Sequence, residues 1–169
     1  LYTWQKLQYF DMSGNDLTGI IPNVYTSLIN LQLFDVSSNR LRGDPFFFLS
    51  LPDIISANMS FNSFSDLSGM SIYPSNFNVR YIDVSYNELF GTLPRNISRI
   101  FPKLLSFILD HNCLYPDIPD DICSMKNLQT LIANKVGDSC ESTFVRSAKS
   151  ITRHYEVPDC LWEMEALQN

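Results

Sequence analysis

Apolar side chains recur along most of the chain at a spacing of 23 to 25 residues. Six of them serve as anchors for a repeat: Leu7, Leu31, Ile54, Val79, Leu104 and Leu128. We call the segment that begins at each anchor a coil, and number the coils one to six. Positions are counted from the anchor, so that position 3 is the third residue after it. Self-similarity at a fixed period of this length indicates a stacked repeat architecture.

Positions 3 and 5 are apolar in every coil, and the residue between them is mostly polar. Position 3 holds Phe10, Phe34, Ala57, Ile82, Phe107 and Leu131, and position 5 holds Met12, Val36, Met59, Val84, Leu109 and Ala133. Such alternation predicts a short strand with one buried face. A single coil cannot bury that face alone. We therefore expect the coils to stack and their strands to pair in parallel into a curved sheet.

Three polar or backbone-directing residues recur later in the coil. Position 8 holds Asn15, Asn39, Asn62, Asn87 and Asn112, position 12 holds Gly19, Gly43 and Gly91, and position 15 holds Pro22, Pro94 and Pro119. An inward-facing Asn amide can donate to and accept from backbone groups that water cannot reach, which predicts a structural ladder. Gly and Pro fit a turn onto the convex side. Asp66 replaces Gly in coil three, and Val136 replaces Asn in coil six.

The segments LQYFDMSGNDLTGIIP and VRYIDVSYNELFGTLP carry this pattern most completely. They resemble the leucine-rich repeat family, LxxLxLxxNxL, and within it the extracellular LxGxIP subtype of plant receptors and wall-associated inhibitors. The resemblance implies an α/β repeat solenoid, right-handed and curved, with short parallel strands on the concave face. It further implies an irregular or 3-10 convex side and a helical C-terminal cap. It specifies the fold far better than the function.

The chain is predicted to divide into repeats over residues 1–140 and a cap over residues 141–169. Residues 2–6 resemble the tail of an earlier coil, so we expect a capping segment, further repeats or a partner before them. After residue 140 the repeat stops. Apolar residues then follow near-helical spacing after a candidate N-cap, Ser142, at Val145, Ala148, Ile151 and Tyr155. This spacing predicts an amphipathic helix over the last coil, with Trp162, Met164 and Leu167 completing the seal.

Four cysteines lie in the last third of the chain, and their spacing disfavours a zinc site. We expect two disulfides. Cys113 and Cys123 belong to one coil and are expected on different sides of it, so we prefer Cys113 with Cys140. That choice leaves Cys123 with Cys160, and Cys140 with Cys160 remains an alternative.

Two glycosylation sequons, at Asn58 and Asn96, accompany the cysteines. Together they favour a secreted or cell-surface protein. The chain has 169 residues, is 45% apolar and carries a formal charge of -6. This composition excludes a disordered tail, and the acidic balance argues against nucleic acid as a partner. No apolar run is long enough to cross a bilayer.

Side chains at positions 2, 4, 6 and 7 are expected to point outward on the concave face. The candidate ligand-binding residues are Tyr9, Asp11, Asp35, Asn58, Phe61, Tyr81, Asp83, Tyr86, Asp110 and His111. The acidic residues would attract a basic ligand. However, Asp and Ser are also the residues that the family usually has at these strand positions. The aromatic residues and His111 are less usual there, and aromatic side chains are enriched at binding hot spots. The long convex loop at residues 66–77 is a second candidate.

No catalytic motif is recognised, and neither a metal site nor a cofactor is expected. A triad of His111, Asp110 and a serine can be assembled only by free choice among many serines. We therefore expect a non-catalytic recognition module of an extracellular receptor or inhibitor, which binds a protein, peptide or glycan on its concave face. The alternative is a structural subunit of a larger extracellular or cell-surface assembly.

Overall fold

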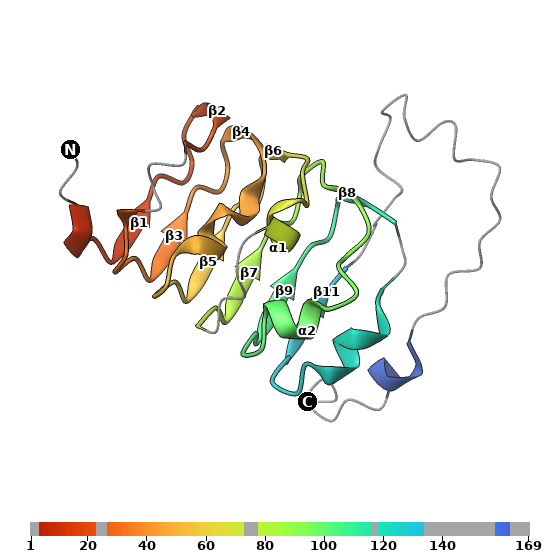
Figure 1. Ribbon diagram of the computed structural model, residues 1–169. Coiled ribbons are helices and arrows are strands. Elements are labelled where there is room, and N and C mark those ends of the chain that lie inside the picture. Colours follow the sequence, from red (N-terminus) through yellow and green to blue (C-terminus); the bar gives the residue numbers. More distant parts are fainter. Residues whose placement is uncertain (1–3, 23–26, 73–77, 116–117, 134–157, 163–169) are drawn as a thin grey trace.

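The computed structural model describes residues 4–22, 27–72, 78–115, 118–133 and 158–162. Coils stack side by side along one axis, and each contributes one strand to a six-stranded parallel sheet (Figure 1). The strands follow chain order: β1 (Tyr9–Asp11), β3 (Leu33–Asp35), β5 (Ser56–Asn58), β7 (Tyr81–Asp83), β9 (Ser106–Ile108) and β11 (Thr130–Ile132). The predicted solenoid is confirmed.

The register of this sheet follows the repeat without slippage. Phe34 pairs with Phe10 on one side and Ala57 on the other, and Ile82 pairs with Ala57 and Phe107. Each position therefore forms a row along the solenoid. The position 3 row is buried, since Phe34 and Ala57 are 1% exposed and Phe107 is 0% exposed. Burial of this continuous apolar row stabilises a stack that no single coil could hold together.

A second set of short parallel strands lies across the core from the first sheet. Its members are β2 (Thr18–Ile20), β4 (Arg40–Gly43) and β6 (Ser63–Phe64) in one sheet, and β8 (Phe90–Gly91) and β10 (Cys113–Leu114) in another. We expected Gly19, Gly43 and Gly91 to fit a turn onto the convex side, and they lie within or at the end of these short strands. Their φ angles of 92°, 94° and 108° still require glycine.

Short helical segments complete the convex side. They are η1 (Trp4–Lys6), η3 (Pro45–Ser50), α1 (Gly69–Ile72), α2 (Ile97–Ile100) and η4 (Asp120–Ser124). In η3 the side chains of Phe46, Phe47 and Phe48 are buried in the core. The α1 helix packs on η3, and α2 packs on η4. None of the helices in the described ranges is long and apolar enough to cross a bilayer.

The position 8 asparagines form the ladder that their spacing predicts. The Asn87 amide nitrogen donates to the carbonyl oxygens of Met59, Val84 and Ser85, at 3.0 to 3.1 Å. Its Oδ1 accepts from the Phe64 amide at 3.0 Å. Asn39, Asn62 and Asn112 repeat this arrangement one or more coils away. The ladder thus connects each of coils two to five to the coil before it.

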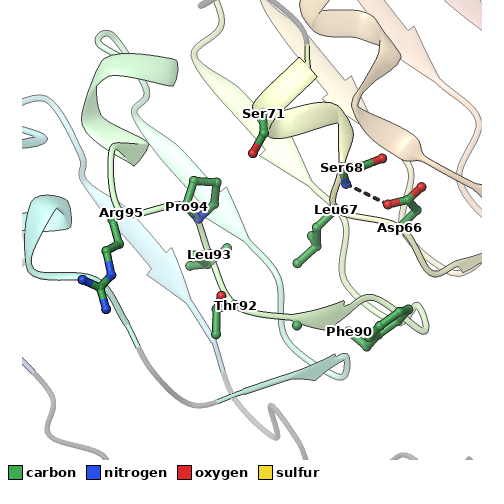
Figure 2. Close-up of a pocket in the computed structure, with 10 residues that line it drawn as sticks. Asp66, Leu67, Ser68, Ser71, Phe90, Thr92, Leu93, Pro94 and Arg95 are labelled. Atoms are coloured by element: carbon green, nitrogen blue, oxygen red, sulfur yellow. Dashed lines mark hydrogen bonds between the residues drawn. The ribbon is translucent and has the colours of Figure 1, made fainter. Parts of the chain in front are cut away.

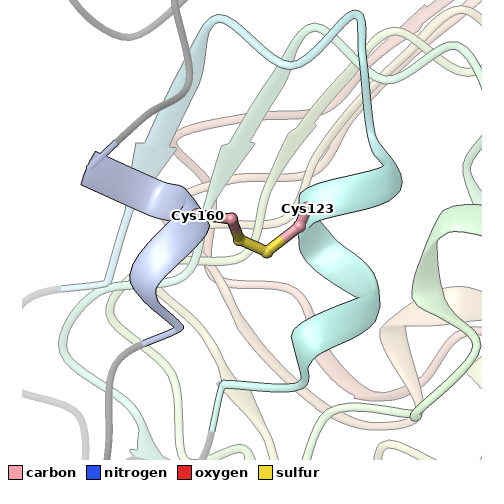
Figure 3. The surroundings of a disulfide bond; sticks show 2 residues. All are labelled: Cys123 and Cys160. Carbon is pink, nitrogen blue, oxygen red and sulfur yellow. A yellow bond between two sulfur atoms is a disulfide. The ribbon is translucent and has the colours of Figure 1, made fainter.

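A disulfide fastens the C-terminal part of the chain to the last coils. Cys123 in η4 is bonded to Cys160 in η6 (Asp159–Trp162), with their Cα atoms 5.8 Å apart (Figure 3). A bridge between Cys140 and Cys160 is therefore not formed. Cys113 is also disulfide-bonded. Its expected partner Cys140 lies outside the described residues, as do the boundary expected after residue 140, the helix expected at Val145 to Tyr155, and Met164 and Leu167.

Candidate ligand-binding surface

The side chains at position 4 hydrogen-bond to backbone amides just after the strands of the sheet. The Asp83 Oδ1 accepts from the Ser85 amide at 2.9 Å and from the Ser85 hydroxyl at 2.7 Å. Asp11 makes the same two bonds to Ser13, and Asn58 makes them to Ser60. These contacts favour a structural role for one carboxylate oxygen and leave the other oxygen of Asp11 and Asp83 for solvent or a ligand.

The serines at position 6 differ from expectation. Ser37, Ser60 and Ser85 are buried, so they do not contribute to an outward surface. They turn inward because their amides hydrogen-bond to the side chain two residues before, in a tight Asx-type turn. The concave surface is therefore defined here by positions 2, 4 and 7 of the six-stranded sheet.

Position 7 has a left-handed backbone in all five coils where it is described. Gly14 has a φ of 67°, whereas Ser38, Phe61, Tyr86 and His111 have φ between 52° and 56°. This region costs a residue with a Cβ atom about 1 to 2 kcal/mol. Coils two to five thus keep a side chain at a position where glycine would relieve strain, and the sequence offered no direct signal of this.

Three of the predicted binding residues stack on one another at position 7. The ring of Tyr86 lies between those of Phe61 and His111, with centroid distances of 4.3 Å and 4.0 Å and interplanar angles of 9° and 11°. We call Phe61, Tyr86 and His111 the aromatic row. Phe61 and Tyr86 are 52% and 42% exposed, so the row is partly open to solvent.

An acidic partner orients the last member of this row. The Nδ1 atom of His111 lies 2.7 Å from Oδ2 of Asp110, and the two side chains are 24% and 13% exposed. Asp110 and His111 would suit a catalytic dyad, but no hydroxyl group of the described residues hydrogen-bonds to His111. The pair orients the imidazole against Tyr86.

The other two aromatic candidates lie apart from the row. Tyr81 is at position 2, where its neighbours across the sheet are Ser56 and Ser106, and Tyr9 is beside Leu33. We expected Phe61, Tyr81, Tyr86 and His111 to cluster on coils three to five. Three of these rings stack, whereas Tyr81 lies at the start of β7, away from Tyr86, which follows the end of that strand. Asp11, Asp35 and Asp83 follow position 4 across coils one, two and four. The described residues of the concave surface and position 6 include no Lys or Arg.

The two sequons lie in different environments. Asn58 is half-buried in β5, and its amide donates to Asp35 at 3.1 Å while its Oδ1 accepts from Ser60. Asn96 is exposed immediately before α2, and its side chain makes no capping hydrogen bond. The amide nitrogen of Asn96 is therefore the more accessible acceptor for a glycan.

A shallow hollow of about 400 Å³ lies on the convex side, where the second set of strands is interrupted (Figure 2). After β6 the chain turns away, because the amides of Ser65 and Asp66 both donate to the Gly43 carbonyl oxygen. Asp66 then accepts from the Ser68 amide at 2.7 Å. The hollow separates this loop from Phe90 and the segment at Thr92 to Arg95. The second candidate segment, residues 66–77, thus contributes one wall through its described part.

One carboxylate that the sequence did not single out lies beneath this loop. Asp44 caps η3 by accepting from the Phe46 amide at 2.7 Å. Burial raises the pKa of Asp44 to about 6, the hydrogen bond from Phe46 opposes this shift, and the charge of Asp66 adds to it. A side chain at Gly69 would collide with the Asp44 carboxylate. The described residues include no group of three His, Cys, Asp or Glu side chains placed to hold a metal ion.

Comparison with known proteins agrees with this geometry. The Leucine Rich Repeat family model matches residues 6–28 and 78–100. Receptor-like protein 14 of Arabidopsis thaliana is 33% identical over 115 residues, which cover 67% of this chain and 12% of that protein. The chain therefore spans only a small part of this curated relative.

Two solved structures of plant receptor kinases share the fold. The Arabidopsis receptor kinase HAESA, in complex with the peptide hormone IDA and the co-receptor SERK1, has a TM-score of 0.71 and 28% identity. This match covers 79% of this chain and 22% of HAESA. The leucine-rich repeat ectodomain of GASSHO1/SCHENGEN3 from Arabidopsis thaliana, in complex with CASPARIAN STRIP INTEGRITY FACTOR 2, has a TM-score of 0.65 and 25% identity. That match covers 77% of this chain and 16% of the receptor.

The repeat pattern, the parallel sheet with its Asn ladder and these matches agree with one another. The chain belongs to the plant-type leucine-rich repeat family.

Proposed function

We propose that this chain is a non-catalytic, extracellular recognition module that binds a peptide on its concave surface. The aromatic row carries the proposal, because it keeps three stacked rings partly exposed at backbone positions that favour glycine. Stacked rings give a rigid apolar contact at low entropic cost to binding. The carboxylates at position 4 add a charge preference beside it. The receptor kinases HAESA and GASSHO1/SCHENGEN3, which share this fold, were each solved with a bound partner.

Peptide selection on the 169-residue chain tests this proposal. A random phage-displayed peptide library is selected on the wild-type chain, and the affinity of the enriched peptides is then measured on variants. The concave variant combines Tyr86→Ser with Asp83→Asn. Serine is tolerated at position 7, because Ser38 holds the same backbone conformation in coil two. The matched control is Phe90→Ser, which removes an exposed ring on the opposite side.

The concave variant is expected to bind the selected peptides at least about tenfold more weakly, which is the loss typical of a hot-spot contact. The Phe90→Ser control should bind them as the wild type does. Peptides that bind the concave variant and the wild type equally would contradict the proposal. That result, together with a large native assembly in light scattering, would favour the alternative of a structural subunit.

A further inference from the structure

The aromatic row ends abruptly at Phe61. Both faces of the Tyr86 ring are covered, by Phe61 and His111, whereas among the described residues Phe61 has a stacked ring only on its Tyr86 side. On the other side of Phe61 lies coil two, the preceding coil, which has Ser38 at position 7. The Asn39 amide donates to the Phe61 carbonyl oxygen at 3.1 Å, and the Ser38 amide donates to that of Ser60 at 2.9 Å. Ser38 therefore occupies the neighbouring position 7 in line with the aromatic row, but it has no ring to continue the stack.

The backbone at this step is already shaped to continue the stack. Ser38 has a φ of 56°, and Phe61, Tyr86 and His111 have φ of 54°, 52° and 53°. Rings within the row are 4.0 to 4.3 Å apart. A planar group from a ligand could thus lie over Ser38 at the same spacing and cover the open face of Phe61. The greater exposure of Phe61, 52% against 42% for Tyr86, agrees with this opening.

The negative charge on the concave surface of coils one and two favours a positively charged planar group. On the concave surface, coils one and two carry the carboxylates Asp11 and Asp35. The oxygens of Asp35 also accept hydrogen bonds from the Ser37 amide and the Asn58 side chain. Hydrogen bonds from the Ser13 hydroxyl and amide lower the pKa of Asp11, which keeps it ionised. Arg40 is the nearest cation in sequence, and its guanidinium is held 3.0 Å from Asp16. Positions 2, 4 and 7 of these two coils hold no Lys or Arg, so an incoming cation meets these carboxylates without a resident cation at the concave positions.

We propose that an arginine side chain of the peptide ligand lies over Ser38, with its guanidinium stacked on the open face of Phe61 beside the carboxylates of coils one and two. This inference rests on the proposed function and specifies the chemistry of its ligand. A guanidinium is planar, weakly hydrated and able to stack on an aromatic ring while it pairs with carboxylates. A lysine ammonium lacks the planar shape.

Three capped tripeptides serve as probes: acetyl-Gly-Arg-Gly-amide and its counterparts with Lys or Tyr in place of Arg. Ring resonances of the isotope-labelled chain are followed by NMR during titration with each probe. The Arg probe is expected to shift the Phe61 resonances, and to bind about two- to fivefold more tightly than the Lys probe, as exposed cation–π contacts do. Its affinity should fall as salt is added. An equal or stronger response to the Lys or Tyr probe, or no response to any probe, overturns the proposal.

The decisive variant places an aromatic side chain at residue 38, where the guanidinium is proposed to lie. Ser38→Tyr should extend the stack, since aromatic residues already occupy this conformation in coils three and four, and should abolish the response to the Arg probe. Gly14→Tyr is the matched control, because it adds a ring one coil further on, at a φ of 67° with nothing within 4 Å of the new Cβ. It should keep or strengthen the response, because a ring at position 7 of coil one would face the guanidinium from the side opposite Phe61. Phe61→Leu removes the stacking face, and the Arg probe should then no longer shift the ring resonances of Tyr86, which lies against Phe61 in the wild type. This variant keeps the test available even if Ser38→Tyr does not fold.

The two proposals fail in different ways. Peptides selected from the phage library should be rich in arginine and lose at least about tenfold in affinity for Ser38→Tyr. Peptides that depend on Tyr86 and Asp83 but bind Ser38→Tyr normally would overturn the arginine position and leave the concave recognition module standing. Peptides whose affinity is unchanged by the substitutions at Tyr86 and Asp83 would overturn the proposed function itself.

Discussion

The asparagines at position 8 of coils two to five each satisfy backbone groups of two neighbouring coils. Asn87 is only 8% exposed and makes four hydrogen bonds to backbone atoms, three as a donor and one as an acceptor. Asn15, in coil one, is exposed, and its amide donates only to the carbonyl oxygens of Met12 and Ser13. The same residue type at the same position therefore has different partners at different depths.

Asn87→Ala is expected to lower the free energy of unfolding by about 3 kcal/mol, because it leaves buried backbone groups without partners. Asn15→Ala should cost about 1 kcal/mol, since water can replace the lost bonds. Urea unfolding followed by circular dichroism measures both. Equal losses for the two variants would show that burial does not determine the contribution of the ladder.

Asp44 should make stability depend on pH in an unusual direction for a carboxylate. Its pKa is raised from 3.8 to about 6 in the folded chain, mainly by burial, so the folded state favours the protonated form. Its stabilising contribution is therefore complete below the unfolded pKa and is lost as the pH rises through about 6. Asp44→Asn keeps an oxygen acceptor for the Phe46 amide and removes the charge.

Asp44→Asn is expected to be more stable than the wild type at pH 7.5, with the difference shrinking towards pH 4.5. Thermal unfolding of both proteins across this pH range measures the difference. A gap that is constant with pH, or that widens on acidification, would contradict the raised pKa of Asp44.

At the scale of elements, the convex strands depend on backbone conformations that the concave strands do not need. Gly43 ends β4 with a φ of 94°, and a Cβ there would meet Ile20 at 3.5 Å, an ordinary contact. The constraint at Gly43 is thus conformational and not steric crowding. Where coil three carries Asp66 in place of this glycine, the strand stops and the hollow of Figure 2 opens.

Gly43→Ala is expected to destabilise the chain by about 1 to 2 kcal/mol, through the cost of a left-handed backbone for a residue with a Cβ atom. Ser38→Ala in the same coil is the control, because Ser38 already has a positive φ and an exposed side chain. It should change stability by less than about 0.5 kcal/mol. Comparable losses in the two variants, measured by denaturant unfolding, would refute the conformational explanation.

At the scale of the whole molecule, the bond between Cys123 and Cys160 connects residues 37 apart in sequence. It holds η6 against η4, beside the last described coils. Such a cross-link stabilises mainly by restricting the unfolded chain. The bond therefore links η6 covalently to the convex side of the last described coils.

Replacing both Cys123 and Cys160 with Ser is expected to cost about 3 to 4 kcal/mol, from the entropy of a loop of this length. Calorimetry on the double variant measures the loss and leaves the bond of Cys113 in place, which a reducing buffer would not. An unchanged unfolding temperature would show that the bridge adds no restriction beyond that of the folded solenoid.

The sequence by itself determined which residues lie in the same row along the solenoid. Counting from the anchors placed Phe34, Phe107 and Asn87 in the core and Phe61, Tyr86 and His111 in one outward row. This worked because a solenoid is close to one-dimensional, so each coil pairs only with its neighbours and a position number converts directly into a place in space.

Only the tertiary structure decided how side chains within and between the rows meet. It turned the position 6 serines inward, separated Tyr81 from the aromatic row, interrupted the convex strands at Asp66 and buried Asp44. These outcomes depend on backbone angles, side-chain rotamers and the depth of each group below the surface. A repeat pattern records which residues are neighbours, but not which way they turn or how much water reaches them.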